Sequence, residues 1–93
     1  MPIRTGAVTA VESKAIYRQP EWSPNRIPTG TRYTVWIHVG MSVAAVPIYT
    51  LDALRASACL EAKRVGRPVT VSTRGTRWGE EIVSVDIQQE AIA

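Results

Sequence analysis

The sequence predicts a small, mainly β domain with one helix, built as a five-stranded barrel. Four segments alternate apolar and polar residues at the period of two that a strand imposes, and a fifth, residues 43–49, is a short apolar run. A sixth carries its apolar residues at helical spacing and ends at Gly66 and Pro68. The chain has 93 residues, of which 45% are hydrophobic and 20% charged, as in an ordinary globular domain. We therefore expect a single domain over residues 1–93, with an ordered core from 6 to 87.

The first strand is expected at residues 7–18, where Val8, Val11 and Ile16 are interleaved with polar residues. The alternation slips once near Ser13, which indicates a bulge or bend at that point. Residues 19–31 follow as a long loop, because their three prolines remove three backbone donors and rule out a central strand. Loops of this length are often functional in compact domains.

The clearest strand is residues 32–39, in which Val35 and Ile37 point inward. A turn that begins at Gly40 leads into a strand at 43–49, so the two form a hairpin. Pro47 lies within that second strand, and it indicates an edge position or a bulge rather than a central place in the sheet.

The helix is expected at residues 51–65, with Thr50 as its N-cap and an inward stripe of Leu51, Leu54, Ala58, Ala62 and Val65. Strands at 69–74 and 82–87 follow, joined by a glycine-bracketed turn at 75–79, and residues 88–93 form a tail. The last strand is expected to turn Val83, Val85 and Ile87 to one face. The predicted core is Val35, Ile37, Leu54, Ala58, Val71, Val83 and Val85.

This order of elements resembles the OB-fold, a five-stranded Greek-key barrel with a helix between its third and fourth strands. The resemblance covers residues 6–87 and depends on element order, not on a motif. An SH3-like barrel is the main alternative, but a helix of about four turns fits it poorly. The resemblance implies that a ligand meets the outer surface of the second and third strands, between the loops that join strands one to two and four to five.

Aromatic and cationic residues gather where the resemblance places a ligand. Trp36 and His38 alternate with the inward Val35 and Ile37, so they project from the outer face. Single-stranded nucleic acid needs this combination, because bases stack on aromatic rings while cations follow the phosphates. A net charge of +3 also favours anionic partners. The candidate nucleic-acid-binding residues are Trp22, Arg26, Arg32, Trp36, His38, Arg74, Arg77 and Trp78.

Each of these residues also has a structural interpretation. In that interpretation, Trp36 would pack beneath the long loop and Trp22 would hold that loop in place. Trp78 would fold back over the barrel, and the arginines would only keep the protein soluble. His38 is then a hydrogen-bonded strand residue. The same tryptophans and arginines also suit an interface with a protein partner or with a second copy of the chain, which is the alternative function.

Catalysis has little support in the sequence. One His and one Cys lie on different elements, and zinc spacing, a phosphate-binding glycine loop and a nucleophile elbow are all missing. Glu80 and Glu81 point to opposite faces of a strand, so they cannot act as a facing acid and base. We expect a binding module that is not an enzyme and that uses no cofactor or metal.

Cysteine usage and hydropathy predict the compartment. Cys59 is the only cysteine, which excludes an internal disulfide and fits a reducing environment. The first residues lack the apolar core of a signal peptide, and no window is apolar enough for a membrane span. We therefore expect a cytoplasmic protein that does not insert into a membrane.

Overall fold

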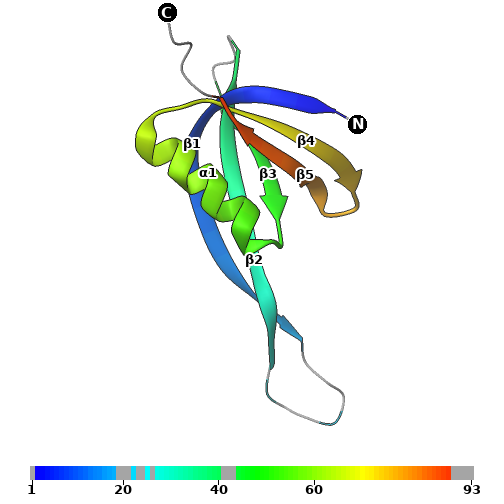
Figure 1. Cartoon of the computed structure of the whole chain (residues 1–93). Coiled ribbons are helices and arrows are strands. Elements are labelled where there is room, and N and C mark those ends of the chain that lie inside the picture. Colours follow the sequence, from blue (N-terminus) through cyan, green and yellow to red (C-terminus); the bar gives the residue numbers. More distant parts are fainter. Residues whose placement is uncertain (1, 19–21, 23–24, 26, 41–43, 89–93) are drawn as a thin grey trace, which may run out of the picture.

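The computed structural model describes residues 2–18, 22, 25, 27–40 and 44–88, which form five strands and one helix (Figure 1). This number and order of elements confirm the sequence prediction. The bounds are β1 (Ile3–Arg18), β2 (Ile27–Val39), β3 (Val46–Thr50), α1 (Ala53–Val65), β4 (Val69–Thr76) and β5 (Gly79–Ile87).

The five strands form a closed barrel in the order β1-β2-β3-β5-β4, with β4 pairing back to β1. All neighbouring strands are antiparallel except β3 and β5, which run parallel and pair at Tyr49 and Glu81. The predicted class, a mainly β chain with one helix and a closed five-stranded sheet, is thereby confirmed. Pro47 lies where β3 pairs only with β2, so its missing N–H leaves no ladder bond unmade on the other side.

The core fills the barrel with β-branched side chains from all five strands. Val35, Ile37 and Val71 are fully buried, as the alternation of their strands predicted. The buried cluster also contains Val8, Ile48, Cys59, Ala62, Val69 and Ile82. Side chains of this shape pack well on a pleated surface, which explains why strands rich in valine and isoleucine closed into the barrel.

The prediction for the helix was wrong about its start and its inward face. The helix begins at Ala53, and Asp52 caps it by accepting a 2.8 Å hydrogen bond from the backbone N of Leu54. Of the predicted inward stripe, Ala62 is buried, but Leu54 is 81% exposed and Leu51 and Val65 are exposed as well. The helix buries Ala56 and Cys59 beside Ala62. Small side chains let the helix approach a barrel end that the strand residues already fill.

The predicted end of the helix at Val65 is confirmed, and the backbone geometry of Gly66 explains why the helix stops there. Gly66 has φ of 73°, the left-handed conformation that favours glycine, and its N–H bonds back to the carbonyl of Lys63. The predicted core residue Ala58 is only half-buried, because the helix is rotated away from the expected stripe.

Two irregularities change which residues of β5 and β1 face inward. A register shift opposite Ser72 and Thr73 leaves Val83 as an extra residue, so Ile82 is buried and Val83 is half-buried, against the prediction. Val85 and Ile87 pack against the core from its edge. In β1 the shifts lie between Val8 and Ala10 and between Ile16 and Tyr17, not near Ser13.

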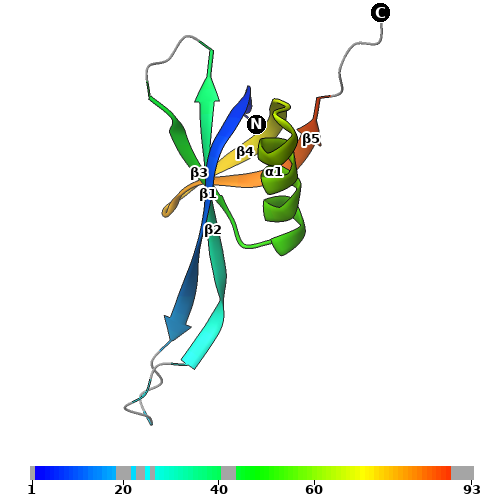
Figure 2. The ribbon, with the colours of Figure 1, turned by 90° about the vertical axis from the view of Figure 1, so that its left-hand side faces the viewer.

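The β1–β2 hairpin is much longer than predicted and extends beyond the barrel as a two-stranded arm (Figures 1 and 2). Pairing continues to Arg18 and Ile27, so the expected loop at 19–31 was wrong for residues 27–31. Proline at position 28 is compatible with this because each strand of the arm has an unpaired edge. The arm gives the molecule extents of 62 × 23 × 23 Å.

Several predicted positions fall outside the described residues. These are Arg26 and the prolines of the β1–β2 connection, the predicted strand start at Val43, and the tail beyond Gln88. The strand described after the turn begins at Val46, later than expected.

Candidate nucleic-acid interface

The outer face of β2 and β3 carries the candidate residues. Because Val35 and Ile37 are buried inside the barrel, Arg32, Trp36 and His38 project outward from β2. Tyr49 lies on the same outer face of β3, since its neighbour Ile48 faces the core and its partner is Thr34. This face is where the sequence placed the ligand.

A hollow of about 420 Å³ opens on this outer face. Its residues come from the arm, from β2 and β3, and from the β4–β5 hairpin, whose turn lies on the side of the barrel away from α1 (Figure 2). We call it the outer groove, and it is lined by Ile16, Arg32, Tyr49, Leu51, Arg74, Thr76, Trp78 and Glu81.

Arg32 and Tyr49 form one fixed unit in this groove. The guanidinium carbon of Arg32 lies 4.3 Å from the centroid of the Tyr49 ring, and its Nη2 donates a 3.0 Å hydrogen bond to the carbonyl of Trp78. The Tyr49 hydroxyl lies 2.7 Å from that of Thr76, and only 4% of Tyr49 is exposed. A positive charge is thereby held at the groove by contacts to β3 and to the turn between β4 and β5.

Arg77 and Trp78 form the turn between β4 and β5. Thr76 organises this turn, because its Oγ1 accepts from the N–H of Trp78 and donates to the carbonyl of Gly79. The guanidinium carbon of Arg77 lies 4.5 Å from the centroid of the Trp78 ring, which is 62% exposed. A cation thus lies over the ring, while the exposure of Trp78 leaves much of the side chain accessible to a stacking partner.

Arg74 and Glu81 form a cross-strand ion pair on the wall of the groove. They are register partners, and Arg74 places Nε 2.7 Å and Nη2 2.6 Å from the same oxygen, Glu81 Oε1. The Glu81 side chain is only 19% exposed, whereas that of Arg74 is 64% exposed. The charge of Arg74 is therefore largely compensated, and it contributes less to an anion site than Arg32 or Arg77.

Lys14 adds a cation that the sequence analysis did not single out. It is the register partner of Arg32 in the arm, so both side chains leave the ribbon on the same face. Lys14 is exposed and forms no ion pair within the described residues.

Trp36 and His38 lie on the outer face but do not line the groove. Four strand positions separate Trp36 from Arg32, which corresponds to about 13 Å at the usual rise per residue. Both are half-buried, and the Trp36 ring nitrogen is buried without a hydrogen-bond partner among the described residues. Trp22 lies in the β1–β2 connection and is 79% exposed, while Arg26 lies outside the described residues.

The structure therefore brings together Arg32, Arg74, Arg77 and Trp78 of the predicted residues. Sequence reasoning missed Tyr49, Glu81 and Lys14, although strand alternation around the buried Ile48 and Ile82 would have placed Tyr49 and Glu81 outward. Ile16 and Leu51 escaped notice because the length of the arm and the start of the helix were misjudged.

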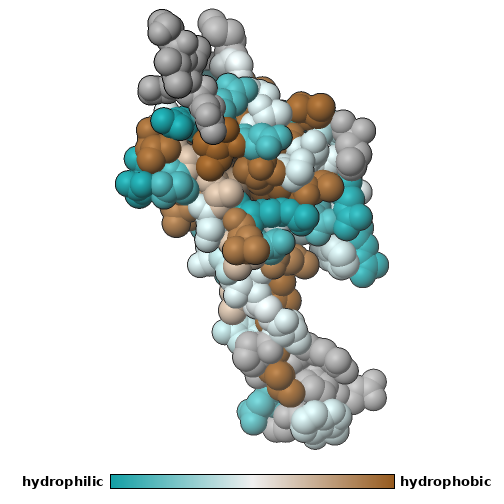
Figure 3. All heavy atoms as spheres, viewed as in Figure 1, coloured by the Kyte–Doolittle hydropathy of each residue, from teal (hydrophilic) through white to brown (hydrophobic). Residues whose placement is uncertain are grey.

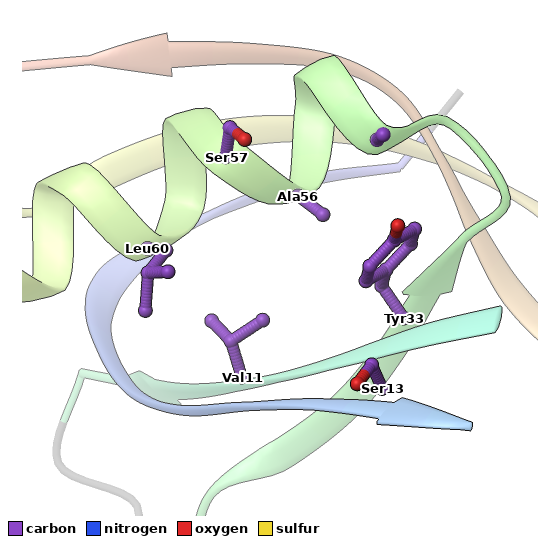
Figure 4. A pocket seen from close by; sticks show the side chains of 7 residues that line it. Val11, Ser13, Tyr33, Ala56, Ser57 and Leu60 are labelled. Atoms are coloured by element: carbon purple, nitrogen blue, oxygen red, sulfur yellow. The ribbon is translucent and has the colours of Figure 1, made fainter. Parts of the chain in front are cut away.

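A smaller hollow of about 210 Å³ lies on the opposite face of the β1–β2 ribbon, beneath α1 (Figure 4). Val11 and Tyr33 from the strands face Ala56 and Leu60 from the helix across it, with no charged residue in the lining. On the face that carries α1, apolar side chains reach the surface in several separate places (Figure 3). Because no charged side chain lines this hollow, it has no group that would attract an anion.

Other candidate chemistry is limited in the described part of the chain. Cys59 is fully buried, and burial raises the pKa of its thiol to about 11, so it is a poor nucleophile. No three His, Cys, Asp or Glu residues cluster among residues 2–18, 22, 25, 27–40 and 44–88 in a way that could hold a metal ion. The helix in these same residues is not long and apolar enough to cross a membrane.

Comparison of the chain with protein-family models, with curated proteins and with solved structures gives no significant match.

Proposed function

We propose that this protein is an OB-like, non-catalytic module that binds single-stranded nucleic acid in the outer groove. The barrel has the element order of an OB-fold, with α1 between its third and fourth strands. Such barrels meet ligands on the outer surface of the second and third strands, between the loops that join strands one to two and four to five. The outer groove lies between these elements.

One observation carries the proposal: the exposed Trp78 and the cation Arg32, which has no ion pair among the described residues, line one groove, with Lys14 and Arg77 next to them. Trp78 offers a face on which an unpaired base can stack, and such stacking is worth about 1–3 kcal/mol per base. Lys14, Arg32 and Arg77 supply positive charge along the backbone path of a bound strand. The volume of about 420 Å³ lies in the range typical of small-ligand sites.

The arrangement favours single strands over duplexes. A base inside a duplex has both faces covered by its neighbours, so Trp78 can stack only on a base that is unpaired or at an end. Glu80 and Glu81 support binding rather than acid–base chemistry, because both are engaged: Glu80 with Arg4 and Thr73, and Glu81 with Arg74.

A protein-interaction or self-assembly function is the second candidate, and the arm favours it. Tyr17 and Ile27 are 54% and 39% exposed on a two-stranded ribbon with two unpaired edges. An isolated ribbon of this kind has little stability in water, and its edges can pair with another chain.

Fluorescence anisotropy with labelled 12-nucleotide DNA and RNA strands of mixed sequence tests the proposal, with salt varied from about 50 to 200 mM. We expect Trp78→Ala to weaken binding by about 1–3 kcal/mol, because it removes a stacking face. Arg77→Ala should lower the slope of log affinity against log salt by about 0.7, the value for one single-strand phosphate contact.

Lys63→Ala is the matched control, since Lys63 is an exposed cation on α1 and does not line the groove. It should leave both affinity and slope nearly unchanged. Absence of binding at low salt, or a Trp78→Ala variant that binds like the parent, contradicts the proposal. Concentration-dependent self-association that is insensitive to salt would support the second candidate instead.

A further inference from the structure

The edge of β1 that faces away from β2 has no neighbouring strand along the arm (Figure 2). β4 pairs with this edge at Ile3–Gly6, and from there to Arg18 the described residues pair β1 with β2 alone. Residues 12–15 are all exposed, so the strand is open to solvent there. An edge strand of this kind presents unpaired backbone N–H and C=O groups to another chain.

The remaining edge of β2 is a poorer partner for another strand. β3 pairs with β2 at Tyr33–Ile37, so the edge that remains on the arm is residues 27–32. Proline at position 28 has no N–H to donate to a new neighbour. The corresponding part of β1, residues 7–18, contains neither proline nor glycine. If another strand extends the arm, its place is therefore beside β1.

Glu12 and Lys14 make the edge of β1 complementary to itself. Both side chains leave the ribbon on its outer face, both are exposed, and neither forms an ion pair within the described residues. Residues directly opposite in an antiparallel pair point to the same face. A second copy of β1 that pairs in antiparallel fashion about Ser13 therefore sets each Glu12 opposite a Lys14.

The neighbouring registers are repulsive. Pairing about residue 12 sets the two Glu12 side chains opposite each other, and pairing about residue 14 does the same with the two Lys14 side chains. Like charges that lie directly opposite destabilise a sheet, whereas opposite charges stabilise it. Charged residues on an edge usually discourage pairing, but this spacing of two residues makes them attract in one register.

The other residues of the edge match in the register about Ser13. Ala10 then lies opposite Ile16 on the outer face, and Val11 lies opposite Ala15 on the inner face. Apolar side chains thus meet apolar side chains on both faces. The result is a four-stranded sheet in the order β2-β1-β1-β2, which is more stable than the isolated two-stranded arm of a single chain.

From this self-complementarity we infer that two copies of the chain form a two-fold symmetric dimer by antiparallel pairing of their β1 strands about Ser13. The inference concerns assembly and does not rest on nucleic-acid binding. The paired edge lies on the side of the arm away from β3, so it leaves the outer groove open. In the dimer Lys14 faces Glu12 of the second copy, and Arg32 and Arg77 remain as cations without an ion pair.

Sedimentation equilibrium of the purified chain across a range of protein concentrations tests the inference, at about 50 mM salt so that charge interactions are weakly screened. We expect the parent to form dimers. Glu12→Lys sets like charges opposite each other at two symmetric positions, so it should raise the dissociation constant of the dimer about tenfold or more, and so should Lys14→Glu. Combining Glu12→Lys with Lys14→Glu restores opposite charges and should return the constant close to that of the parent.

Asp86→Lys is the matched control. It makes the same change of charge as Glu12→Lys, but at an exposed position on β5, away from the arm. The dissociation constant should stay near that of the parent. Because opposite charges set the register, dimerisation of the parent should also weaken as salt is raised, unlike the salt-insensitive association named for the second candidate function.

A second measurement tests the position of the two-fold axis. The axis brings the two residues at position 13 side by side, with Cβ atoms about 4.5–5.5 Å apart. A short bis-maleimide should therefore link Ser13→Cys into a covalent dimer, seen on a denaturing gel. Ser84→Cys, at an exposed position on β5, should stay monomeric on the gel, and Cys59 is buried and does not compete.

A chain that stays monomeric at every concentration, a combined charge swap that does not recover the dimer, or Ser13→Cys that is not linked overturns the inference. None of these outcomes affects the proposed function, which fails separately if no single strand binds.

Discussion

Leu54→Ala should have almost no effect on stability, although Leu54 belongs to the stripe of apolar residues at helical spacing that was predicted to face the core. Leu54 is 81% exposed, so only about a fifth of its surface leaves water on folding. Full burial of a leucine is worth about 1.5–3 kcal/mol, which gives a loss of about 0.3–0.6 kcal/mol here. Alanine is also the better helix former by a few tenths of a kcal/mol, which offsets part of this loss.

Ala62→Leu is the informative comparison, because Ala62 is fully buried where α1 meets the barrel. Adding three carbons to a filled interface normally costs about 1–3 kcal/mol. Urea unfolding followed by circular dichroism should therefore separate the two variants clearly. A loss of about 2–5 kcal/mol for Leu54→Ala, as expected for a buried leucine, would refute the orientation of α1 described above.

Two further predictions concern the barrel itself. Gly6→Ala should destabilise the fold by at least about 1–3 kcal/mol in thermal unfolding, because the added Cβ would lie 2.1 Å from the carbonyl oxygen of His38. Gly75→Ala is the control: a Cβ at position 75 meets open space, so this variant should be neutral or stabilising by up to about 1 kcal/mol. Burial raises the pKa of the Cys59 thiol from 9.0 to about 11, so between these values the folded state keeps a proton that the unfolded state loses. The free energy of unfolding should therefore fall as pH rises from about 9 to 11. Cys59→Ala should remove this contribution to the pH dependence, measured by urea titrations at several pH values.

The sequence predicted the number, order and type of the elements because these depend on local patterns. Val35 and Ile37 alternate with polar residues over a full strand, and Gly66 marks the helix end through a conformation that favours glycine. The helix face was not predictable in the same way. Leucines at helical spacing normally mark the buried side, but the space left at the barrel end accepts only Ala56, Cys59 and Ala62.

The outer groove was only partly predictable because it depends on contacts between distant strands. Alternation placed Arg32 outward, but its stacking on Tyr49 depends on the register of β2 with β3, and its bond to Trp78 on the parallel contact of β3 with β5. Long-range pairings of this kind leave no local signature. The arm escaped prediction for a related reason: Pro28 argues against a central strand but is tolerated in a two-stranded ribbon.

The bulge in β1 determines which side chains of the arm face the outer groove. Side chains alternate with a period of two, so without an extra residue near Thr9 the inward Val8 would be followed by inward Ala10, Glu12 and Lys14. The register shift moves Val11 inward opposite Val35 and turns Lys14 outward beside Arg32. Thr9 Oγ1 donates a 3.2 Å hydrogen bond to the carbonyl of Trp36 across this irregularity. One extra residue in β1 thus both keeps charge out of the barrel and places a cation beside the proposed binding surface.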